Sequence, residues 1–341
     1  MIRRALGLLL LAGQALGTVA GAAFPDTLTL ADLANRSDRW PAALTLAEDI
    51  RLGNGAVIHK GEKVRVARFD GSRVVVVAPG NIMVNLTPGD SGLLDAANQA
   101  WAALTPAQRA IDPESLVADM SLWPLRVRAI SSIASRFGKL APGTELTLLT
   151  ITDKGVELAW PNSANRVDVD FGNTDVFERA RQRALVDPEK RESRIAAALQ
   201  GILVDAEGRP VRDPLGDKKI FAFYFGANWC APCHAFSPDL VRFLDDALPR
   251  HPELEAVLMS NDQQPAQMLA YMREAKMPFP AVPLSDLNRS SLLSGYAVKM
   301  IPHLVVVDRF GKLLASNDDD RGNRADPKDT VDALGKLLGG P

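Results

Sequence analysis

The feature that constrains this chain most is a pair of cysteines placed where an apolar run gives way to a helical pattern. Residues 221–225 form the apolar run and predict a buried strand, and Cys230 and Cys233 follow after a short turn. A helix that begins here directs unpaired N–H groups and a partial positive charge toward the first sulfur. This setting favours the thiolate of Cys230, the reactive form of cysteine, and therefore predicts a redox site.

The same residues allow other interpretations. A purely structural disulfide between these cysteines, the only two in the chain, would close a very small loop and constrain little of the unfolded state. Together with His234 they also spell Cys-x-x-Cys-His, the attachment pattern of c-type haem, but Pro232 and the preceding apolar strand favour the redox interpretation. A metal site that also used His303 would lack a recognised ligand spacing, so neither a metal nor another cofactor is expected.

The N-terminal segment has the three parts of a secretory signal. Arg3 and Arg4 supply positive charge, residues 5–12 are apolar, and small residues at 20–22 form a cleavage site. We expect cleavage after Ala22 and a periplasmic or secreted protein, because glycines make the segment a poor uncleaved anchor. The formal net charge of −2 argues against a nucleic-acid partner.

Short strands joined by tight turns dominate residues 56–86, where Asp70-Gly71 is typical of a hairpin turn. The apolar positions spaced in twos around this turn are Val64, Val66, Val74 and Val76. The pattern returns 82 residues later, at Leu146, Leu148, Val156 and Leu158. We predict a tandem repeat of a small SH3-like β-barrel followed by a helix, at 91–104 and again at 174–186. A chance similarity between valine-rich strands is the alternative.

These patterns divide the chain into five expected segments. They are a signal peptide at 1–22, a first β-barrel-plus-helix unit at 23–104, a helical linker at 105–137, a second β-barrel unit with helices at 138–200, and a C-terminal domain at 201–341. Near the end of the second unit, residues 187–199 are expected to form one charged helix whose Lys and Arg side chains lie in solvent.

Strand and helix patterns alternate in the C-terminal segment. Strands are expected at 219–225, 254–259, 304–307 and 313–315, and helices at 233–248, 265–275, 290–296 and 329–338. This alternation, followed by a final hairpin, predicts an α/β sandwich around a mixed central sheet.

The C-terminal third resembles the thioredoxin superfamily, and within it the tryparedoxin and nucleoredoxin branch. The motifs that carry the resemblance are FAFYFGANWCAPC at 221–233, the Phe-Ser-Pro step at 236–238, KMPFPAVP at 276–283, YAVKMIP at 296–302 and the Gly-Lys turn at 311–312. The resemblance implies a thioredoxin-like domain with Cys230 as nucleophile, Cys233 as resolving thiol and a cis peptide at Ile301-Pro302. The expected substrate-contacting residues are Trp229, Pro232, Ile301 and Pro302.

Two positions depart from the family. Tyr224 stands where ordinary thioredoxins carry a buried Asp, so a buried carboxylate at that place is not expected, as in the tryparedoxin-like branch. His303 stands where Thr usually follows the cis-proline. The two N-terminal repeats lie outside the resemblance.

We therefore expect an exported thiol–disulfide oxidoreductase that reduces or exchanges disulfides in protein substrates. Ala231 and Pro232 place no charge between the sulfurs, so the thiolate has few stabilisers, which favours a reductant. A reductant in an oxidising compartment requires a membrane electron donor. The alternative is an envelope-binding protein in which the barrels hold a partner and the C-terminal domain senses redox state.

Overall fold

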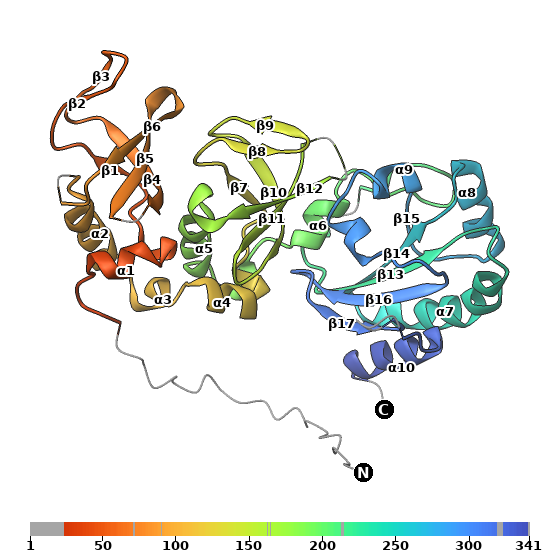
Figure 1. Ribbon diagram of the computed structural model, residues 1–341. Coiled ribbons are helices and arrows are strands. Elements are labelled where there is room, and N and C mark those ends of the chain that lie inside the picture. Colours follow the sequence, from red (N-terminus) through yellow and green to blue (C-terminus); the bar gives the residue numbers. More distant parts are fainter. Residues whose placement is uncertain are drawn as a thin grey trace, which may run out of the picture.

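The computed structural model describes residues 24–70, 72–89, 91–161, 163, 165–212, 215–318 and 323–339. The expected signal peptide, residues 1–22, lies outside this part of the chain. Figure 1 shows three modules that follow one another in a row, which we call the first unit, the second unit and the C-terminal domain. Within the described ranges, no helix is both long enough and apolar enough to cross a membrane.

The first unit, residues 24–104, is built on an antiparallel sheet with the strand order β1-β4-β5-β6. Its elements are α1 (Leu30–Ala34), η1 (Ser37–Arg39), β1 (Leu44–Thr45), β2 (Ile50–Arg51), β3 (Val57–Ile58), β4 (Lys63–Asp70), β5 (Arg73–Ala78), η2 (Pro79–Asn81), β6 (Ile82–Leu86) and α2 (Leu93–Ala102). The four valines spaced in twos are buried in one cluster with Trp101 of α2. The described strands of this sheet end at β1 and β6 without closing on each other, so the expected barrel is not confirmed.

The second unit, residues 105–186, has a sheet of the same kind with the order β12-β11-β10-β7. Its elements are α3 (Pro106–Arg109), α4 (Pro113–Ala118), η3 (Met120–Leu122), β7 (Arg126–Arg128), β8 (Ile133–Ser135), β9 (Gly138–Leu140), β10 (Glu145–Ile151), β11 (Gly155–Ala159), β12 (Arg166–Asp170), η4 (Phe171–Asn173) and α5 (Val176–Ala184). The expected boundary after residue 137 is wrong, because β7 precedes it and pairs with β10 through Val127 and Leu146.

The two sheets share details of their strand pairing. In the first unit Val66 pairs with Val76, and a β-bulge shifts the register just after Val66. In the second unit Leu148 pairs with Leu158, and the register shifts just after Leu148. The two bulges therefore occupy positions 82 residues apart, the difference between 148 and 66.

The charged segment after the second unit is not one helix. It contains η5 (Pro188–Lys190) and, after a break, α6 (Arg194–Leu199). The break occurs because Arg191 is extended and the hydroxyl of Ser193 accepts the N–H of Ala196, which starts a new helix. The apolar side of α6 packs in the core of the C-terminal domain, so the expected boundary after residue 200 is also corrected.

The C-terminal domain has a mixed five-stranded sheet with the order β15-β14-β13-β16-β17, which confirms the predicted α/β architecture. Its elements are β13 (Ile220–Gly226), α7 (Ala231–Arg250), β14 (Leu254–Ser260), α8 (Pro265–Glu274), β15 (Ala281–Val282), α9 (Leu284–Leu287), η6 (Leu293–Tyr296), β16 (His303–Asp308), β17 (Leu313–Ser316) and α10 (Pro327–Leu337). Strand β13 is parallel to β14 and antiparallel to β16.

Alternate side chains of β13 enter two different cores. Ala222 and Tyr224 pack in the cluster that α7, α8 and α10 cover. Phe221, Phe223 and Phe225 pack in the cluster on the other face, with α6 and α9. The central strand is thus covered on both faces, which explains its uninterrupted apolar sequence.

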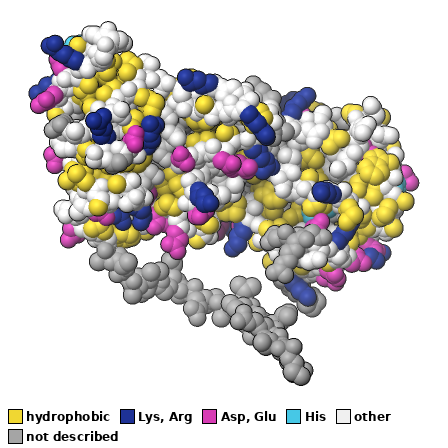
Figure 2. Space-filling model, in the orientation of Figure 1, with side chains coloured by type: hydrophobic (Ala, Val, Ile, Leu, Met, Phe, Trp, Pro, Cys, Tyr) yellow, Lys and Arg dark blue, Asp and Glu magenta, His cyan; other side chains and the backbone are white. Residues whose placement is uncertain are grey.

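Basic and acidic side chains are interspersed on the face of the molecule shown in Figure 2. This distribution agrees with a nearly balanced composition of 39 basic and 41 acidic residues.

Candidate redox site

The cysteine pair lies where β13 passes into α7, as the sequence predicts. Cys230 is the N-cap residue of α7 and forms a disulfide with Cys233. The N–H of Cys233 donates to the Sγ of Cys230 at 3.2 Å, so the first sulfur faces the positive end of the helix. Cys233 is fully buried and Cys230 is 4% exposed, whereas the neighbouring Trp229 is 63% exposed. The half of the disulfide nearer the surface is therefore Cys230.

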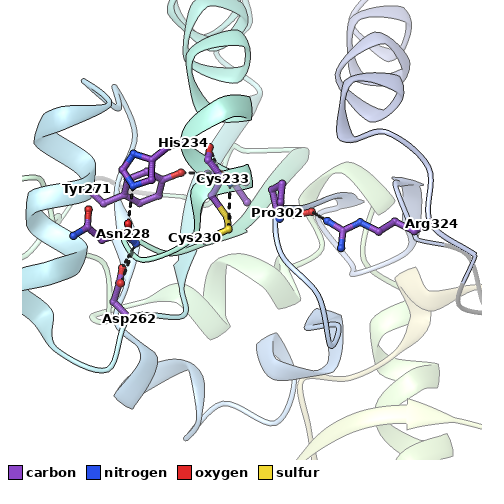
Figure 3. Close-up of a disulfide and its surroundings, with 9 residues drawn as sticks. Asn228, Cys230, Cys233, His234, Asp262, Tyr271, Pro302 and Arg324 are labelled. Atoms are coloured by element: carbon purple, nitrogen blue, oxygen red, sulfur yellow. Dashed lines mark hydrogen bonds between the residues drawn. A yellow bond between two sulfur atoms is a disulfide. The ribbon is translucent and has the colours of Figure 1, made fainter.

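A cis peptide between Ile301 and Pro302 lies at the same end of the sheet. His303, the next residue, pairs with Phe225 at the end of β13, which places Pro302 opposite the turn that leads to the disulfide. Figure 3 shows Pro302 on the sulfur side of the site, with its carbonyl oxygen accepting a 2.5 Å hydrogen bond from Arg324. Pro232 is exposed in the first turn of α7.

Tyr224 occupies the place of the usual buried acid and makes a different network. Its hydroxyl lies 2.8 Å from the hydroxyl of Tyr271 and donates a weak 3.4 Å bond to the carbonyl oxygen of Cys233. Burial raises the pKa of Tyr224 far above that of an exposed tyrosine. The phenol therefore stays protonated and cannot serve as a proton acceptor for the cysteines.

A buried carboxylate is nevertheless present, on a different strand. Asp262 follows β14, and its two oxygens accept the N–H of Asn228 at 3.0 and 3.1 Å. The Ser260 hydroxyl donates to the same carboxylate at 3.2 Å, and burial raises the pKa of Asp262. Sequence reasoning missed Asp262; its signal was a polar residue directly after a buried parallel strand, at the edge where β13 also ends.

His234 does not point into solvent, contrary to the expectation from the sequence. Its Nε2 lies 2.6 Å from the carbonyl oxygen of Asn228, and its ring packs against Tyr271 with 4.9 Å between the centroids. Figure 3 shows His234 and Asp262 on opposite sides of Asn228. The Cys-x-x-Cys-His motif here supplies a contact to the turn before the cysteines.

His303 is buried beside the cis-proline. Its Nδ1 lies 3.1 Å from the Oδ1 of Asn317, which also accepts the N–H of Leu304 at 2.7 Å. Because the amide oxygen can only accept, Nδ1 carries the proton. Burial lowers the pKa of His303, so the ring is held in its neutral form.

No group of three or more His, Cys, Asp or Glu side chains in the described ranges is arranged to hold a metal ion. The four residues considered from the sequence do not converge on one point, because His234 and His303 are each bonded elsewhere.

A mixed sheet with a disulfide at the start of a helix and a cis-proline opposite it defines a redox domain of the thioredoxin type. A family model described as Thioredoxin-like matches residues 217–313. The C-terminal domain of this chain accordingly belongs to the thioredoxin superfamily.

Individual relatives match the same domain. The chain is 37% identical over 133 residues to a probable nucleoredoxin 1 of Arabidopsis thaliana, covering 38% of this chain and 22% of that protein. It is 35% identical over 92 residues to a nucleoredoxin of Xenopus laevis, covering 27% of this chain and 22% of that protein. Among solved structures, native tryparedoxin I from Crithidia fasciculata is 32% identical, with 36% of this chain and 85% of that chain covered and a TM-score of 0.31.

The comparisons also correct one expectation. The chain spans less than a quarter of the length of these two nucleoredoxins. Nucleoredoxins are nuclear or cytosolic proteins, and this contradicts the predicted periplasmic or secreted location. The prediction of export was made from residues 1–22, which lie outside the described part of the chain.

Proposed function

We propose that this chain is a thiol–disulfide oxidoreductase that acts on protein disulfides. The observation that carries the proposal is the Cys230–Cys233 disulfide at the start of α7, with the first sulfur accepting a helix N–H and the second fully buried. A disulfide so placed joins two residues of one helical turn and contributes little to stability, so a chemical role explains it better.

The reaction follows from this geometry. In the reduced protein the Cys230 thiolate attacks one sulfur of the substrate disulfide, forming a mixed disulfide and releasing the other substrate sulfur as a thiolate. The Cys233 thiolate then attacks the Sγ of Cys230, which releases the second substrate thiolate and restores the internal disulfide. Two electrons pass to the substrate, and a dithiol reductant must return them to the pair before the next cycle.

The substrate is proposed to bind between two rims. Trp229 and Pro232 are exposed on the helix side, and Ile301 and Pro302 form the opposite side. Backbone next to the cis-proline would pair with an extended substrate segment. This arrangement suits a flexible protein segment that carries a disulfide.

The direction we propose is reduction, because the dipeptide Ala231-Pro232 adds no charge that would stabilise the thiolate. The membrane electron donor expected from the sequence followed from export and has no part in this proposal.

We also propose that the first and second units are two copies of one unit that holds the protein substrate near the disulfide. The equivalent positions of their bulges support a duplication. So do Gly61 and Gly143, which have φ values of 87° and 84° before β4 and β10. Their open, antiparallel sheets are a departure from the barrel predicted for each copy.

The test is reduction of insulin disulfides by dithiothreitol, followed as precipitation of the free insulin chains. The wild-type protein should accelerate precipitation, and Cys230→Ser should reduce the rate to that of dithiothreitol alone. Cys233→Ser should accumulate a mixed disulfide with insulin that is visible on a non-reducing gel. A wild-type rate equal to that of Cys230→Ser would exclude the proposed function.

A further inference from the structure

The peptide group of Asn228, two residues before Cys230, is held on both sides by side chains. Asp262 accepts its N–H through both carboxylate oxygens, at 3.0 and 3.1 Å. His234 contacts its carbonyl oxygen at 2.6 Å. These two side chains come from different elements, since Asp262 follows β14 and His234 lies in the first turn of α7.

The chemistry of the carbonyl identifies which nitrogen of His234 is protonated. A backbone carbonyl oxygen only accepts, so the Nε2 of His234 must carry a hydrogen. Both the neutral ring with this tautomer and the imidazolium ion satisfy that requirement. The other nitrogen, Nδ1, lies 3.9 Å from the carboxylate of Glu274, which is largely exposed.

The contact is supported by packing rather than left to solvent. The ring of His234 is about one-third exposed and lies against Tyr271, whose hydroxyl bonds to Tyr224. Tyr224 in turn contacts the carbonyl oxygen of Cys233. His234 is therefore the link between the turn that precedes Cys230 and the helical turn that contains Cys233.

We infer that His234 is a positioning residue for thiol–disulfide exchange, acting with Asp262 to fix the turn that carries Trp229 and Cys230. This inference rests on the proposed function and adds to it. When the internal disulfide opens, Cys230 loses its covalent tie to Cys233, and the position of its sulfur depends on this turn. A nucleophile displaced by even a fraction of an ångström attacks more slowly, because the reacting sulfurs must be aligned.

Two matched substitutions test the inference. The amide N–H of Gln reaches about as far as the Nε2 of histidine, whereas that of Asn reaches only about as far as Nδ1. His234→Gln should therefore retain the bond to Asn228, and His234→Asn should lose it. We expect His234→Asn to slow the attack of the reduced protein on a peptide disulfide by about tenfold, and His234→Gln to stay within about twofold of wild type.

Single-turnover kinetics with the reduced protein give this attack rate directly, and thermal unfolding of each variant checks that the fold is unchanged. Combining His234→Asn with Asp262→Ala should slow attack by less than the product of the two single effects, because both residues hold one peptide.

The outcomes separate this inference from the proposed function. If wild type does not reduce insulin, the proposed function fails. If wild type is active and His234→Asn reacts as fast as His234→Gln, the positioning role of His234 is refuted. Equal slowing of both variants would also refute it, because the hydrogen bond would then not be what matters.

Discussion

Buried polar side chains are used differently in the N-terminal units and in the C-terminal domain. In and next to the units, the buried Arg181 and Arg194 donate to backbone carbonyl oxygens. In the C-terminal domain, Asp262 and His303 are buried at the end of the sheet that carries the disulfide. The first kind of residue joins segments that are distant in sequence, whereas the second kind surrounds reacting atoms.

Arg194 shows the joining role most clearly. It is 1% exposed and donates to Leu148 and Leu149 at the bulge of β10 and to Phe310 of the C-terminal domain. Its guanidinium also lies 5.0 Å from the ring centre of Trp123. Burial lowers the pKa of Arg194 to about 10, so it remains charged at neutral pH. A buried charge without a carboxylate partner is retained because three carbonyl oxygens and an aromatic face satisfy it.

The comparison teaches that burial of a polar group does not by itself mark a functional site. What distinguishes Asp262 from Arg194 is its target: Asp262 bonds the turn beside Cys230, whereas Arg194 bonds the junction between modules. Substitutions of the two kinds should therefore have separable effects on stability and on chemistry.

The largest expected effect is that of Arg194→Met on stability. Methionine fills a similar volume but leaves the carbonyl oxygens of Leu148, Leu149 and Phe310 without their buried donor. We expect the free energy of unfolding to fall by about 3 kcal/mol in urea titrations. Reduction of a small disulfide in native buffer should be nearly unchanged.

The matched control is Arg242→Met, which removes an arginine whose side chain is 76% exposed and should change stability by less than about 0.5 kcal/mol. A loss of activity in Arg194→Met without a loss of stability would break the distinction between joining and reacting residues.

A smaller effect is expected at the junction between the first and second units. A Cβ added to Gly172 would lie 2.5 Å from the Trp40 ring and 3.1 Å from the carbonyl oxygen of Ala67. Gly172→Ala should therefore destabilise the protein by about 2 kcal/mol through overpacking. Gly216→Ala is the control, since a Cβ there meets no atom within 4 Å. Identical unfolding curves for the two variants would show that the first unit is not held by this contact.

The smallest expected effect concerns His303 and pH. Because burial lowers its pKa in the folded state, the unfolded chain binds the proton more readily. Stability should be constant for this group above about pH 6.5 and should fall as the pH drops toward the lowered folded value, by at most about 1.4 kcal/mol per pH unit. The charged groups near the ring are Asp318 and Arg324, which act in opposite directions.

His303→Gln should flatten this dependence between pH 7.5 and pH 5, as followed by urea unfolding at each pH. An unchanged slope in the variant would assign the pH dependence to other groups.

The sequence predicted the C-terminal domain well because its signals are local. The apolar run of β13, the Cys-x-x-Cys and the Ile-Pro step each declare their role within a few residues. Thr105 is a further local success, since it caps α3 with Gln108 as expected. Asp262 was missed because its partner, the N–H of Asn228, is 34 residues away and a backbone donor leaves no trace in the sequence.

Long-range geometry also explains the other errors. Closure of a barrel depends on pairing between the first and last strands, and alternation within strands does not reveal whether those edges meet. Arg191 and Arg194 lie in a run of mixed charges typical of a solvated helix, yet both are buried because the next module covers them. Only the arrangement of modules could show this.

The two β-bulges give the row of modules a direction. The bulge of β4 places the carbonyl of Ala67 against Gly172 in the following unit, and the bulge of β10 places those of Leu148 and Leu149 against Arg194, next to the following domain. Each unit thus has a distinct front and back, and the front is always the kinked strand. A row built this way can lengthen by repetition in its middle while both of its ends keep their original neighbours.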